Sequence, residues 1–121
     1  MSQLTLLPPE PAQQSISQIE IVLPLNAAVE AINYCARKKV QILGWEGWIR
    51  AQDGRVGHGN APQGTASLGH LSMQDAADFC RRIVQAAALE WSQENPETTD
   101  QLHFCITIAR SEADDIRLRM D

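Results

Sequence analysis

The segment from Ser72 to Pro96 constrains the fold most, because it reads as one long amphipathic helix. Ser72-Met73-Gln74-Asp75 matches a capping box, with Leu71 and Ala76 placed for a hydrophobic staple. Asn95-Pro96 ends the pattern. A helix with one apolar face must bury that face against another layer. The apolar stripe consists of Ala76, Phe79, Cys80, Ile83, Val84, Ala87, Ala88 and Trp91.

Strand patterns elsewhere in the chain supply that layer. Apolar and polar residues alternate from Ser15 to Leu23, which predicts a half-buried strand with Ile19 on its apolar face. Residues 40–49 and 102–109 predict two further strands, and residues 116–120 alternate with arginines as a last, exposed one. Between them, Asp53-Gly54 indicates a turn, after which a short return strand can start.

A second amphipathic helix follows Pro24, with apolar residues at Ala28, Val29, Ile32, Cys35 and Ala36. We therefore expect an α+β fold: a mixed or antiparallel sheet of about four to five strands with two helices on one face, in the order β-α-β-(β)-α-β-β. The chain of 121 residues suits one domain. Residues 1–15 are expected to be a flexible, proline-rich arm, and residues 16–121 a single domain.

Charge and hydropathy exclude several classes of function. The net charge of −5 argues against nucleic-acid binding, which calls for a basic surface. No apolar run approaches the roughly 20 residues of a membrane span, and the N-terminus lacks a secretory signal, so we expect a cytoplasmic protein. The cysteines, Cys35, Cys80 and Cys105, lie in apolar patterns and are expected to be buried, reduced thiols.

No catalytic or metal-binding arrangement stands out. Among the histidines, His58, His70 and His103, no pair has the short spacing of a zinc motif; His103 and Cys105 share a strand face but make only two ligands. The glycines from Gly54 to Gly69 indicate a loop or a loosely paired hairpin, because the next helix starts too late for a phosphate loop. We expect no enzyme, no cofactor and no metal.

The run Trp45-Glu46-Gly47-Trp48-Ile49 gathers two of the three tryptophans around one carboxylate. On a regular strand Trp45 shares a face with Ile49, and Trp48 shares the other with Glu46. Only one tryptophan can then enter the core beside the helices. An exposed tryptophan beside a carboxylate is typical of an interface hot spot. The alternative is that a terminal segment covers it.

The run Val40-Gln41-Ile42-Leu43-Gly44-Trp45-Glu46-Gly47-Trp48, preceded by a strand, a proline and a helix that ends in basic residues, resembles small immunity proteins of bacterial polymorphic-toxin and contact-dependent growth inhibition systems. The resemblance covers about residues 16–110. It implies a protein that binds one cognate toxin tightly and covers its active site or an essential surface. Many such toxins are basic nucleases, which an acidic inhibitor suits. The resemblance implies no catalytic residues.

We therefore expect a monomer that binds its toxin in a 1:1 complex, without nucleic acid or membrane. Two alternatives remain open: an acidic secretion chaperone or adaptor that holds a client segment, and a small-ligand-binding domain or enzyme that uses His58 or His103. The expected contact residues lie on the second strand, in the loop after it and among the late acids: Trp45, Glu46, Trp48, Asp53, Arg55, His58, Asp100, Asp114 and Asp115.

Overall fold

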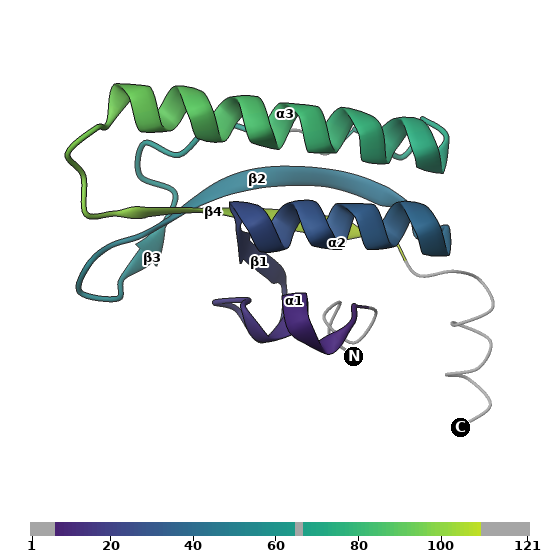
Figure 1. Cartoon of the computed structure of the whole chain (residues 1–121), viewed down its shortest axis with the longest axis horizontal. Helices are drawn as coiled ribbons and strands as arrows, with labels where there is room; N and C mark the ends of the chain where they lie inside the picture. Colours follow the sequence, from purple (N-terminus) through teal and green to yellow (C-terminus); the bar gives the residue numbers. More distant parts are fainter. Residues whose placement is uncertain (1–6, 65–66, 110–121) are drawn as a thin grey trace.

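Four antiparallel strands form the sheet that the sequence patterns predict (Figure 1). The computed structural model describes residues 7–64 and 67–109. The strands are β1 (Ile21–Pro24), β2 (Ile42–Arg50), β3 (Val56–Gly57) and β4 (Gln101–Ile108). Their spatial order is β1-β4-β2-β3, so the last described strand lies between the first two. The predicted α+β class is confirmed.

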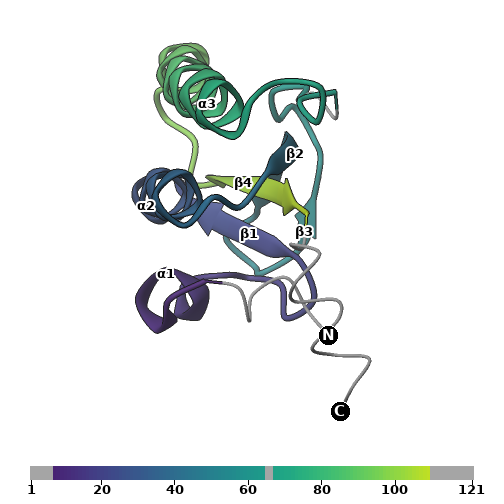
Figure 2. The ribbon, with the colours of Figure 1, turned by 90° about the vertical axis from the view of Figure 1, so that its right-hand side faces the viewer.

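Two helices cover one face of this sheet, as Figure 2 shows. They are α2 (Leu25–Lys38) and α3 (Met73–Glu94). Their apolar stripes pack on alternate residues of β4, where Phe104, Ile106 and Ile108 belong to the core. We call the opposite side of the sheet its outer face. No helix within the described ranges is both long and apolar enough to cross a bilayer.

A bulge in β2 sets which of its residues face the helices. Ile42 pairs with Ile108 on β4, but the next register pair is Gly44 with Thr107, so Leu43 is an extra residue. Because side chains alternate along a strand, an inserted residue switches the alternation. Ile42 and Trp45 consequently both lie in the core although their spacing is odd.

The first strand is shorter than predicted. Residues 15–20 form bends instead of continuing β1, and Ile19, expected on the buried face, is 74% exposed. The Ser15 hydroxyl donates to the carbonyl oxygen of Ser17 and accepts from the amide of Val22, at 2.8 and 3.0 Å. Serine side chains that form hydrogen bonds with the nearby backbone compete with strand pairing. At residues 15–20 these local bonds replace the strand.

The proline-rich N-terminal arm contains a helix that the sequence patterns did not predict. Pro9–Gln13 forms a short helix, α1, beside α2. Proline tolerates the first helical turn because its missing N–H would have no partner there. Pro11 is buried. The strand predicted for residues 116–120 lies outside the described residues.

The three cysteines are free and buried, as expected. Burial raises the pKa of the Cys35 thiol to about 11 and is the main cause that raises the pKa of Cys80 and of Cys105 to about 12. The uncharged thiol is therefore the stable form at neutral pH.

Candidate functional site

The segment of residues 58–64, which we call the edge loop, lies along the edge of β2 that β3 leaves uncovered. The amide of Gly47 donates to the carbonyl oxygen of Pro62 at 3.2 Å, and further along the amide of Leu68 donates to that of Leu43 at 3.0 Å. These bonds satisfy backbone groups that an open edge would expose. The glycine-rich segment predicted as a loop thus packs along the edge of β2 and is hydrogen-bonded to it.

Two glycines make this close contact possible. A Cβ atom on Gly47 would lie 2.7 Å from the carbonyl oxygen of Pro62. A Cβ on Gly64 would overlap the carbonyl group of Trp45. Neither glycine has a positive φ, so what they provide is space.

A cluster of three side chains lies where the edge loop meets the outer face, and we call Glu46, Trp48 and His58 the outer cluster. The indole N–H of Trp48 donates to Oε1 of Glu46 at 3.1 Å. The ring of His58 packs edge-on against Trp48 with 5.3 Å between centroids, and its Nδ1 lies 3.2 Å from the carbonyl oxygen of Gly47. Trp48 is half-buried, whereas Glu46 and His58 are exposed. Two contacts therefore restrain the indole, one at its N–H and one at its ring.

Trp45 lies on the other side of the sheet, as the alternation predicts. It is 6% exposed and packs against Phe104 with 5.8 Å between ring centroids. Its buried indole nitrogen has no hydrogen-bond partner among the described residues. Trp45 therefore does not join the outer cluster, although it was expected among the contact residues.

Asp53 and Arg55 lie at the tip of the β2–β3 turn. Nε of Arg55 lies 2.7 Å from Oδ2 of Asp53, and both side chains are well exposed. Asp100 immediately precedes β4, at the same end of the sheet, since Gln101 pairs with Arg50. An exposed ion pair adds little stability. Of the remaining expected contacts, Asp114 and Asp115 lie outside the described residues.

His103 is a buried histidine on the outer face, and it pairs across the strands with Trp48. Burial lowers its pKa below the ordinary value; the nearby Arg50 lowers it further, and a hydrogen bond to the carbonyl of Gln101 opposes the shift. Cys105 is next on the same face. In the described ranges, no group of three or more histidines, cysteines and carboxylates is close enough to hold a metal ion.

A hollow between the edge loop and β2 has a volume of about 460 Å³ and is lined by Trp45, Glu46, Gly47, His58, Ala61, Pro62, Gln63 and Gly64. This glycine-lined hollow is lined by His58 but not by His103. The two histidines that the sequence offered for a ligand site therefore do not line a common hollow here. It adjoins the outer cluster and extends its surface.

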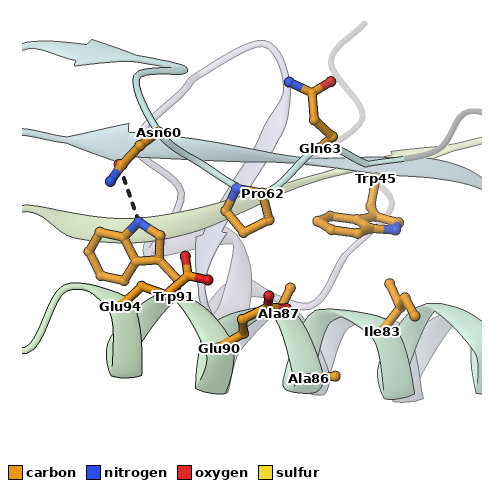
Figure 3. Close-up of a pocket in the computed structure, with 10 residues that line it drawn as sticks. All are labelled: Trp45, Asn60, Pro62, Gln63, Ile83, Ala86, Ala87, Glu90, Trp91 and Glu94. Carbon is orange, nitrogen blue, oxygen red and sulfur yellow. Dashed lines mark hydrogen bonds between the residues drawn. The ribbon is translucent and has the colours of Figure 1, made fainter.

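A second cavity lies on the helix side of the edge loop, and the sequence patterns did not predict it. Figure 3 shows Trp45 and Trp91 at opposite ends of this tryptophan pocket, with Pro62 over it and α3 below. Its volume is about 350 Å³. Asn60 accepts from the indole N–H of Trp91 at 3.3 Å. The lining residues are Trp45, Asn60, Pro62, Gln63, Ile83, Ala86, Ala87, Glu90, Trp91 and Glu94.

The helical pattern assigned Trp91 to the apolar stripe, and its burial supports that assignment. The pattern gave no sign that Trp91 also forms one end of a cavity, because the opposite end comes from β2 and the cover from the edge loop. A hint was the spacing of Glu90 and Glu94, which places two acids beside Trp91 on one side of the helix.

No protein-family model matches the sequence, and comparisons with curated proteins and with solved structures gave no match.

Proposed function

We propose that this protein is an immunity protein that binds and neutralises a basic bacterial toxin through the outer cluster and the adjoining β2–β3 turn. The observation that carries the proposal is the half-buried Trp48, whose indole N–H is bonded to Glu46 and whose ring packs against the ring of His58. A large aromatic side chain held in place before binding loses little conformational freedom in a complex. It is therefore a suitable anchor for a partner.

The charge close to this anchor is mixed. Arg50 shares the outer face with Glu46, and Arg55 is paired with Asp53. The attraction to a basic partner therefore comes mainly from the net charge of −5, which raises the association rate at low salt. Affinity at higher salt would depend on the burial of Trp48.

The first experiment is capture of partners on the tagged protein from its native host, with salt raised during elution. The supporting result is a single stoichiometric basic protein that is toxic when expressed alone and harmless when co-expressed with this chain. Size-exclusion chromatography then separates a 1:1 complex of monomers from the dimer that a secretion chaperone would form.

Two substitutions test the assigned surface. Trp48→Ala should weaken toxin binding by roughly 2 kcal/mol or more, as hot-spot truncations do. Glu46→Lys should slow association and weaken the salt dependence. The matched controls are Leu89→Ala and Glu30→Lys, which change an exposed leucine on α3 and an exposed glutamate on α2. Unchanged affinity in folded Trp48→Ala and Glu46→Lys proteins would show that the toxin binds elsewhere.

A further inference from the structure

The tryptophan pocket has the dimensions of a site for one small group. Its volume of about 350 Å³ lies near the lower end of the range for small-ligand pockets, about 300–1,000 Å³. A linear alkyl chain with one polar head group is of a suitable size.

Residues at the rim of the pocket are hydrogen-bonded to one another without a ligand. Asn60 accepts from the indole N–H of Trp91 and donates through Nδ2 to Oδ1 of Asn95 at 3.0 Å. The hydrogen bond from the amide of Gly47 to the carbonyl oxygen of Pro62 holds the edge loop, which covers the pocket, against β2. Because the Trp91 N–H is occupied by Asn60, what Trp91 offers a ligand is aromatic surface. A pre-formed pocket of this kind binds without the cost of ordering a loop.

The charge around the pocket has one sign. Glu90 and Glu94 lie one helical turn apart, both are exposed, and neither forms an ion pair with another residue in the described ranges. None of the ten lining residues is basic. Carboxylates four residues apart on a helix repel each other, so a cation between them would remove an unfavourable interaction.

We infer that the tryptophan pocket binds an organic cation, namely a guanidinium or ammonium group on an alkyl chain. The alkyl chain would contact the indoles and Pro62, while the head group interacts with the aromatic rings and the carboxylates of Glu90 and Glu94. An anion would meet only negative charge. A purely apolar ligand would not relieve the repulsion between the two carboxylates.

Such a cation has two sources: a free small molecule, or an arginine or lysine side chain presented by another protein. Binding at this pocket does not require the outer cluster, because none of Glu46, Trp48 and His58 lines the pocket. Loss of cation binding would therefore leave the toxin-binding proposal unaffected, and the reverse also holds.

The test is titration of the ¹⁵N-labelled full chain, at constant ionic strength, followed through its three indole N–H signals. The probes are agmatine and Nα-acetyl-arginine methylamide, and the neutral control is Nα-acetyl-citrulline methylamide. We expect the Trp45 and Trp91 signals to shift, while the Trp48 signal, assigned from a Trp48→Phe variant, stays in place. Binding of agmatine alone indicates a free cation; binding of both probes indicates that a protein side chain is also accepted.

Substitution of the carboxylates completes the test. The double variant Glu90→Gln, Glu94→Gln should weaken cation binding roughly tenfold, and Glu30→Gln on α2 should have no effect. These exposed positions tolerate glutamine without loss of the fold. Any one of three results would overturn the inference: no shift with either cation, equal binding of the citrulline control, or unchanged affinity in the folded double variant.

Discussion

The backbone of Gly64 lies directly against the carbonyl group of Trp45, with no room for a side chain between them. This contact joins the edge loop to the strand that carries both Trp45 and Trp48. The edge loop in turn forms one boundary of the glycine-lined hollow and also covers the tryptophan pocket. The spacing of the edge loop from β2 therefore determines the geometry of both sites.

Gly64→Ala should destabilise the protein by about 1–3 kcal/mol, because the added methyl group forces backbone apart. Chemical denaturation followed by tryptophan fluorescence would measure the loss. The matched control is Gly57→Ala, since a Cβ at Gly57 meets no atom within 4 Å and Gly57 has no positive φ. Equal stability of the two variants would mean that the edge loop moves away from β2 at little cost.

Ser72→Ala should cost about 1 kcal/mol of stability, within the range of about 0.5–2 kcal/mol for lost helix caps. The Ser72 hydroxyl accepts from the amide of Asp75 at 3.0 Å, and alanine leaves that donor without this partner. Ser92→Ala is the control, because the exposed Ser92 bonds only the carbonyl of Leu89 within the same helix. Thermal unfolding would compare the two variants. An equal loss of stability in both would mean that the effect comes from replacing any serine on α3 and not from the lost cap.

The stability of the protein should fall as the pH drops below about 6.5 because of His103. The unfolded chain binds a proton near the ordinary histidine value of 6.5, whereas burial keeps the folded His103 neutral to lower pH. The contribution of His103 to the unfolding free energy is thus fully present above pH 6.5 and is lost as the pH falls from there through the pKa of the folded state.

His103→Gln should flatten the dependence of the unfolding free energy on pH between 7 and 5, measured by urea denaturation. His70→Gln changes an exposed histidine and serves as the control. An unchanged slope in the His103→Gln protein would show that other groups cause the pH dependence.

All three cysteines should resist thiol reagents in the native protein. The raised pKa values of Cys35, Cys80 and Cys105 leave very little thiolate at pH 8, and burial blocks access. With Ellman's reagent we expect no rapid reaction in buffer and three thiols in guanidinium. Rapid reaction of one thiol in buffer would reveal local opening around that residue.

The element types could be predicted from the sequence because they depend on local periodicity. The stripe from Ala76 to Trp91 and the cap at Ser72 define α3, and alternation in β4 places Phe104 toward the helices. The same alternation separates Trp45 from Trp48. Where it failed, at residues 15–20, the local hydrogen bonds of Ser15 opposed the strand pattern.

The sequence by itself therefore determined that α2, α3, β2 and β4 form and that Trp45 and Trp48 lie on opposite faces of the sheet. The tertiary structure decided the strand order, the path of the edge loop and the tryptophan pocket. Trp91 and Asn60 are 31 residues apart in the chain, yet one hydrogen bond joins them at the lip of the pocket. Local patterns carry information about neighbours within a few residues, whereas such contacts form only when distant segments pack on a common core.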